Sequence, residues 1–325
     1  MKLVIAPDSS SNDYEVHKAL RERGIDVLVI DHHEAERISE NACVINNQLC
    51  DYPTKSLSGV GMVYKFCSYI DKVLEVENAN QFVDLVALGL IADVMLMRDF
   101  ETKHLINLGL SQITNPFFRG MTIKNEYSLG SNITPFGVAF YVAPYINAIT
   151  RCGTLEEKFL LFESMLDFRA YEQIPSTNRG FKGTYESRVE QACRNCTNIK
   201  NRQNKARDTS LKIIEQIIKE QDLLNNQIIL VRLNKEHSID KNLTGLVATK
   251  IANEYQKPTL ILNEVQNEEG LSWQGSGRIF SQSNFTTFRH FLEESGYFDY
   301  AQGHEGAFGA SIKDINVESF IEYSN

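Results

Sequence analysis

The chain has 325 residues, of which 42% are hydrophobic and 23% are charged, a composition that fits a globular protein and excludes a disordered one. A formal net charge of −9 argues against a protein that coats duplex nucleic acid through phosphate contacts, but leaves room for an enzyme with a local basic groove. No apolar run approaches the ~18–20 residues of a membrane helix, and the N-terminal apolar run is too short for a signal peptide. We therefore expect a cytoplasmic protein of about two domains with no membrane partner.

The first hundred residues alternate between apolar, strand-like runs and helix-like segments. The patterns predict strands over 3–6, 27–30 and 82–90 and helices over 14–23 and 61–74. Because strands that alternate with helices pair in parallel, we expect a parallel sheet that is covered by helices on both faces.

The remaining residues predict a helical region, a connecting helix and a second alternating region. Residues 100–185 have mainly helix-like patterns, and residues 185–224 form a polar stretch without Gly or Pro whose second half is amphipathic. From residue 227 onward the pattern gives a strand, a helix over 243–255, a strand over 259–262 and a glycine-rich end. The predicted fold class is α/β, with a long helix between two domains.

Three acidic residues share one context, since Asp8, Asp31 and Asp93 each follow an apolar run that is predicted as a strand. Sites in open parallel sheets form at the carboxyl ends of the strands, so these carboxylates are expected at one sheet edge. A single Asp after a strand is more often a helix cap. Three of them, one followed by two histidines, favour a functional site.

The sharpest local feature is Asp31-His32-His33. Imidazole together with carboxylates suits Mn²⁺, Fe²⁺ or Zn²⁺, and a carboxylate-rich set favours Mn²⁺ or Mg²⁺. Two such ions can clamp a phosphodiester and generate hydroxide at neutral pH. As an isolated tripeptide the motif is weak, and a surface histidine pair is the alternative.

Seven segments, in order along nearly the whole chain, resemble the motifs of the DHH phosphoesterases and, within them, of the RecJ-type single-strand-specific exonucleases. They are VIAPDSSSND (4–13), DVLVIDHHEAE (26–36), LSGVGMVYKF (57–66), ALGLIADVMLM (87–97), APYINAITR (143–151), GSGR (275–278) and GHEGAFG (303–309). Taken alone, the last two segments indicate only a glycine turn or bulge and a structural histidine at His304.

The resemblance implies a parallel-sheet DHH domain over 1–184, a connecting helix over 185–225 and a smaller α/β DHH-associated domain over 226–325. It also implies the roles of individual residues. Asp8, His32 and Asp93 are expected to bind metal, His33 to lie close to the scissile phosphate, and Asp31 to orient the histidines. The substrate-binding residues that it implies are Asn147, Arg151, Ser276, Arg278, Gly303 and His304.

The activity that the resemblance implies is Mn²⁺- or Mg²⁺-dependent hydrolysis of single-stranded DNA from its 5′ end, as in DNA repair and recombination nucleases. One alternative is an enzyme of the same family that cuts short RNA oligonucleotides or cyclic dinucleotides. Another is a catalytically incomplete relative that binds single strands or replisome proteins.

The family carries a further Asp-rich first motif before the segment that here begins at residue 4, and the sequence leaves no room for it. This motif normally supplies about half of the metal ligands, so the residues present are expected to hold one ion rather than two. Four explanations for the absent motif are open. The sequence is a fragment or the product of a split gene, a second polypeptide supplies the motif, the protein is a degenerate member that only binds, or it is a self-sufficient one-metal enzyme.

Overall fold

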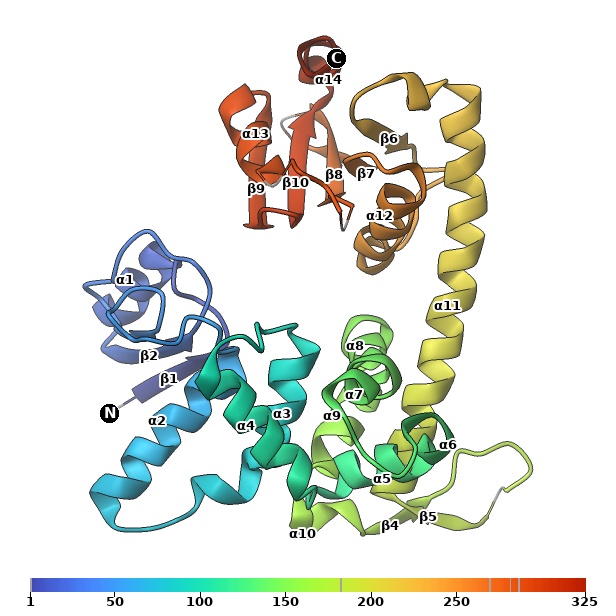
Figure 1. Cartoon of the computed structure of the whole chain (residues 1–325). Helices are drawn as coiled ribbons and strands as arrows, with labels where there is room; N and C mark the ends of the chain where they lie inside the picture. The colour runs from blue at the N-terminus through green and yellow to red at the C-terminus, as the bar shows by residue number, and fades with distance from the viewer. Residues whose placement is uncertain (1, 182, 269, 281, 286) are drawn as a thin grey trace. The chain divides into compact units, whose positions relative to one another are not determined.

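The computed structural model describes residues 2–181, 183–268, 270–280, 282–285 and 287–325 (Figure 1). The chain divides into two compact units, residues 1–200 and 201–325. The boundary falls inside one long helix, α11 (Arg188–Glu220). Among the described residues, no helix is long and apolar enough to cross a membrane.

The first unit is built on a parallel sheet in the strand order β1-β2-β3. Its strands are β1 (Lys2–Pro7), β2 (Ile25–Asp31) and β3 (Cys43–Asn46), and α1 (Tyr14–Glu22) connects the first two. The chain turns back after α1 at Gly24, whose φ of +70° is readily adopted only by glycine. The predicted parallel sheet, its first two strands and the first helix are confirmed.

The predicted strand over 82–90 is wrong, because this segment forms helix α3 (Val83–Ala92). Seven of its ten residues are buried, six of them apolar, so apolar residues lie on all sides of the helix and it carries no amphipathic pattern. An apolar run of this length cannot be distinguished from a buried strand by periodicity. The sheet instead takes its third strand from β3, which was not predicted. Asp93 therefore follows a helix and not a strand.

Helices make up most of the rest of the first unit, in agreement with the prediction for 100–185. They are α2 (Gly59–Leu74), η1 (Ala79–Phe82), α4 (Phe100–Ser111), α5 (Pro116–Lys124), α6 (Glu126–Leu129), α7 (Pro135–Tyr141), α8 (Ala143–Cys152), α9 (Leu155–Ser164) and α10 (Asp167–Ala170). A short antiparallel hairpin, β4 (Gln173–Pro175) with β5 (Tyr185–Ser187), precedes α11.

Helix α11 contributes to the hydrophobic core of each unit, which confirms the predicted amphipathic connector. Its first turns bury Ala192, Cys196 and Ile199 in the core of the first unit. Its later turns bury Ile214 and Ile218 in a core cluster of the second unit.

The second unit is a five-stranded mixed sheet in the order β6-β7-β8-β10-β9. The strands are β6 (Ile229–Leu233), β7 (Thr259–Asn267), β8 (Gly270–Arg278), β9 (Phe298–His304) and β10 (Ala307–Lys313), and η2 (Leu223–Asn225) precedes them. Helix α12 (Lys241–Tyr255) packs on β7 and β8. Helices α13 (Phe288–Ser295) and α14 (Asp314–Ser324) cover the opposite face, where Trp273 is buried.

Asp84 of α3 is a buried anchor for the helices that follow. Its side chain is 1% exposed and accepts hydrogen bonds from the backbone N–H groups of Thr114 and Asn115, at 2.8 and 2.7 Å. Asn115 in turn caps α5 by accepting from the N–H of Phe117 at 3.1 Å. The start of α5 is therefore positioned from α3.

We predict that Asp84→Ala lowers the free energy of unfolding of the first unit by about 1–3 kcal/mol, since the buried N–H of Asn115 and the partly buried N–H of Thr114 lose their acceptor. Chemical unfolding followed by circular dichroism measures the change. Asp51→Ala, at an exposed position, is the matched control and is expected to cost little. Equal stabilities of the two variants would contradict the anchoring role.

Candidate metal centre and substrate-binding residues

Asp8 begins the site, directly after β1. Its N–H donates to the carbonyl of Ile30 at 2.9 Å, which fixes its backbone against the end of β2. Its φ of +59° lies in the left-handed region, where a residue other than glycine is strained. The carboxylate occupies space left by Gly59 at the start of α2, because a Cβ there would collide with Asp8 Oδ1. The side chain is 62% exposed, so a ligand can reach it.

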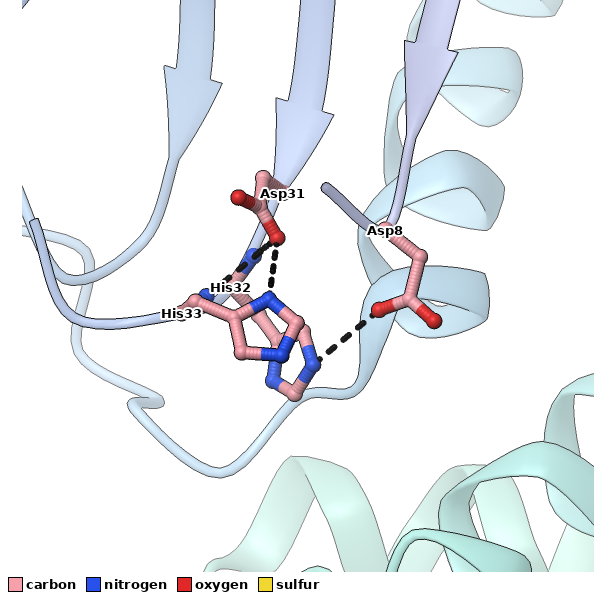
Figure 2. A group of neighbouring side chains, drawn as sticks. All are labelled: Asp8, Asp31, His32 and His33. Carbon is pink, nitrogen blue, oxygen red and sulfur yellow. Dashed lines mark hydrogen bonds and ion pairs between the residues drawn. The ribbon is translucent and has the colours of Figure 1, made fainter. Parts of the chain in front are cut away.

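Asp31, the last residue of β2, holds the surrounding loops through its carboxylate (Figure 2). Oδ1 accepts from the N–H groups of His32 and His33 at 2.8 and 3.3 Å and from His33 Nδ1 at 2.7 Å. Oδ2 accepts from the N–H of Ser11 at 3.2 Å. Burial raises the pKa of Asp31, but the hydrogen bonds from His33, Ser11 and His32 outweigh it and hold that pKa far below its usual range.

His33 is set by this contact with Asp31. An ionised carboxylate only accepts hydrogen bonds, so His33 Nδ1 carries a proton and the second ring nitrogen, Nε2, points away from Asp31. The hydrogen bond to Asp31 raises the pKa of the His33 imidazole, and the nearby charges of Asp8 and Asp93 act in the same direction against partial burial. The ring is therefore held in one orientation and favours its protonated form.

His32 brings the carboxylates together. Its Nε2 lies 3.1 Å from Asp8 Oδ1 and 3.4 Å from Asp93 Oδ2, and its side chain is 6% exposed. Figure 2 shows the His32 ring directed at the Asp8 carboxylate, with the His33 ring beside it at a centroid distance of 4.5 Å. Although Asp93 comes from the end of α3 and not from a strand, it still reaches this point.

The donor set fits a divalent metal ion. Asp8, Asp31, His32 and His33 each offer a ligand atom within 4.8 Å of the others. Because both oxygens of Asp31 already accept hydrogen bonds, the candidate ligands are Asp8 and His32, with Asp93 beside them. Two carboxylates and one imidazole suit Mn²⁺ and, with water, Mg²⁺.

Two supporting residues were not predicted from the sequence. Asn46, at the end of β3, donates to Ser11 Oγ at 2.9 Å and to the carbonyl of His33 at 2.8 Å. His17 of α1 is buried between Ser10 and Ser39, with ring nitrogens 3.3 and 3.0 Å from the two hydroxyls. Asn46 was missed together with β3, since its signal is its place at the end of a third parallel strand.

The predicted substrate-binding residues fall into two sets. Asn147 and Arg151 lie in the first unit, four residues apart on α8, and therefore on one helix face. Ser276, Arg278 and His304 lie in the second unit, on one face of the sheet, because Ala307 of β10 pairs with Arg278 on one side and His304 on the other.

The Arg278 guanidinium is positioned by its surroundings. Its Nη1 donates to the carbonyls of Gly277 and Phe308, at 2.6 and 3.2 Å. Its Nη2 fills space beside Gly245 of α12, where a Cβ would collide with it. The neighbouring Ser276 hydroxyl lies 2.9 Å from that of Thr244.

Gly303 serves the same region through its backbone. Its φ of +133° is disfavoured for other residues, and a Cβ would lie 2.9 Å from the carbonyl oxygen of Ala307. The bend that it permits comes just before His304.

Comparison with known proteins identifies the class. Residues 2–90 match the family described as "DHH family, N-terminal domain", so this segment of the chain is a DHH-family domain. It is 38% identical over 317 residues to the "Putative SPbeta prophage-derived single-strand DNA-specific exonuclease YorK" of Bacillus subtilis, a match that covers 97% of this chain and 54% of that protein. It is 25% identical over 320 residues to the single-stranded-DNA-specific exonuclease RecJ of Bacillus subtilis, covering 97% of this chain and 37% of RecJ.

Solved structures support the fold. RecJ from Thermus thermophilus in complex with Mn²⁺ has a TM-score of 0.73 at 18% identity, over 99% of this chain and 45% of that one. An exonuclease RecJ bound to manganese has a TM-score of 0.70 at 20% identity, over 99% of this chain and 75% of that one. The chain spans about half the length of the YorK relative.

We predict that Asp31→Asn lowers the pKa of His33 in the metal-free protein towards the ordinary imidazole value of ~6.5, because the negative acceptor becomes neutral. A pH titration of the His33 ring signals by NMR measures it. The exposed His290 of α13, in the second unit, is the internal control, and its ring signals are expected to be the same in both proteins. An unaltered His33 titration would contradict the part assigned to Asp31.

Proposed function

We propose that this chain is a metal-dependent exonuclease that hydrolyses single-stranded DNA from the 5′ end. The observation that carries the proposal is the meeting of Asp8, His32 and Asp93 at one point, with His33 held beside them by Asp31. The names of its relatives, which describe single-strand DNA-specific exonucleases, agree with it. In this proposal residues 1–184 carry the chemistry, 185–225 connect, and 226–325 hold the strand.

Asp8, His32 and Asp93 would hold Mn²⁺ or Mg²⁺, the ions present in the RecJ structures. The chemistry supplied by such an ion is polarisation of the phosphodiester and activation of water. These three side chains provide ligands for one ion. A second ion needs further ligands, which another segment or a second polypeptide would contribute.

His33 is assigned the proton-handling role. Because Nδ1–H of His33 is held by Asp31, Nε2 is the ring nitrogen that can face the phosphodiester. The raised pKa of His33 favours a protonated ring, which would donate a hydrogen bond or a proton from Nε2 to the leaving oxygen. Asp31 acts through His33, since its carboxylate stabilises the charged ring and sets its orientation. Neither role requires Asp31 to touch substrate or metal.

Arg278, with Ser276, is assigned the terminal phosphate of the strand. A guanidinium offers a planar fork that matches phosphate oxygens, and here it is already ordered by two backbone carbonyls. His304 lies on the same sheet face, Gly303 shapes the backbone just before it, and Asn147 with Arg151 would supply further phosphate contacts on α8. If Arg278 and Ser276 bind a 5′-terminal phosphate, they hold the strand by its 5′ end, and this is the support for cleavage from that end.

We predict that the chain degrades labelled single-stranded DNA with Mn²⁺, and that His33→Ala lowers kcat by about 10²–10⁴-fold while Mn²⁺ affinity is retained. Asp8→Asn is expected to abolish Mn²⁺ binding as well as turnover. Isothermal titration with Mn²⁺ and a 5′- and 3′-label comparison measure both effects. His290→Ala is the control.

The outcomes separate the alternatives. Strand binding without turnover would overturn the nuclease proposal in favour of a binding-only relative. If the chain hydrolysed only dinucleotides, the proposed substrate would change from single-stranded DNA to a small nucleotide.

We predict that Gly245→Ala weakens binding of a 5′-phosphorylated oligonucleotide by about 1.5 kcal/mol, roughly tenfold, because the new methyl displaces Arg278. The same change favours the helix, so lost binding does not reflect unfolding. Fluorescence anisotropy against a 5′-hydroxyl oligonucleotide measures the phosphate preference, and Thr249→Ala, one turn along α12, is the control. An unchanged preference would contradict the assignment of Arg278.

A further inference from the structure

One face of the second sheet is polar on strands β8, β10 and β9. Alternate residues of paired strands point to the same side, and Arg278 pairs with Ala307 while Ser272 pairs with Lys313. The side chains on this face are Ser272, Gln274, Ser276 and Arg278 of β8, Ser311 and Lys313 of β10, and Tyr300, Gln302 and His304 of β9. The candidate phosphate-binding residues thus occupy one end of a longer polar surface.

Helix α12 covers only the β7–β8 side of this face. It packs on those two strands and touches the sheet at Ser276 through Thr244. The hydrophobic core beneath α13 and α14 belongs to the other face, where Trp273, Phe308 and Ile312 are buried. Tyr300 and Gln302 on β9 are exposed, so the β10–β9 side of the polar face is open to solvent.

A β-bulge shapes the far end of the open side. Ser311 pairs with Tyr300, but the next residue, Ile312, pairs with Phe298, which leaves Asp299 as the extra residue. Asp299 and Tyr300 consequently both line a hollow of about 240 Å³. Bulges of this kind re-aim side chains, and this one turns two of them onto the same surface.

The hollow has the chemistry of a nucleotide site. Ser272 and Ser311 form a buried polar floor, and the Ser311 hydroxyl donates to Asp299 Oδ2 at 3.3 Å, which occupies that carboxylate oxygen. Gln274 offers an amide that can donate and accept, Lys313 an ammonium group and Tyr300 an aromatic ring that is 40% exposed. A nucleotide base can stack on an aromatic ring and pair with hydrogen-bonding groups, and its phosphate can pair with an ammonium group, so these side chains match both parts of a nucleotide.

The hollow and Arg278 lie at opposite ends of β8, on the same face of the sheet. Six residue steps along β8 separate Arg278 from Ser272, which is about 20 Å. On β10, Ala307 lies beside Arg278 and Gly309 lies between the two positions, and these small residues leave room for a backbone to approach. A chain of several nucleotides fits this length better than a single nucleotide.

We propose that the open face of β8, β10 and β9 is an extended single-strand track, in which Tyr300 stacks on a base and Lys313 contacts a phosphate several nucleotides from the end held at Arg278. This inference rests on the proposed function. It adds contacts within the second unit that only a strand of several nucleotides can reach, so binding affinity would depend on strand length.

The test is binding of the full chain to oligo-dT by fluorescence anisotropy, with chelator present so that no strand is cut. Tyr300→Ala is expected to weaken binding of a dodecanucleotide at least about fivefold, the effect of one lost stacked base. Lys313→Gln is expected to lower the slope of log affinity against log salt by about 0.7, as for one lost phosphate contact. Because a dinucleotide covers only part of the track, Tyr300→Ala and Lys313→Gln are expected to weaken its binding less than that of the dodecanucleotide.

Tyr323→Ala on α14 and Lys250→Gln on α12, both exposed, are the matched controls. Thermal unfolding of each variant checks that the fold is kept. If Arg278→Ala weakens binding while Tyr300→Ala and Lys313→Gln equal the controls, the track is overturned and the proposed function stands. If the wild-type chain binds no single strand, both are overturned.

Discussion

The candidate centre depends on one buried carboxylate. Asp31 lies at the end of the middle strand and accepts from the loop after β1, from its own following backbone and from a histidine ring. A carboxylate removed from water remains charged only when several donors replace its hydration. These donors are the groups that must be ordered for Asp8, His32 and His33 to meet. The energetic requirement of one buried charge thus imposes the geometry of the whole group.

In each unit, a helix glycine leaves space that a charged side chain fills. Gly59 gives the Asp8 carboxylate its place at the start of α2, and Gly245 gives the Arg278 guanidinium its place on α12. In each case a charged group fills the space that a methyl group would take. Close packing of helix against sheet normally excludes charges, so such openings determine where they can lie. The glycines in these helices therefore position charged side chains as well as permitting close approach.

Local patterns in the sequence predicted much of this architecture, and the failures have a common cause. β1, β2, α2 and α12 are amphipathic or bounded by clear turn residues, and the Asp-His-His group follows an apolar strand. α3 was mistaken for a strand because burial on all sides removes its periodicity, and β3 is only four residues long. The contacts of Asn46 with Ser11 and of Ser11 with Asp31 join residues 20 or more positions apart. Nothing in the local sequence encodes such partners.

The backbone at Asp8 implies a conflict between folding and chemistry. Holding a non-glycine residue at φ +59° costs about 1 kcal/mol, and glycine would remove this cost while deleting the carboxylate. If Asp8 has the metal-binding role proposed above, a copy of the chain released from that role would gain stability by replacing it with glycine. Selection for a sturdier fold and selection for activity oppose each other at this position. In the proposed site, the carboxylate of Asp8 is what the strained backbone at this position supplies in return.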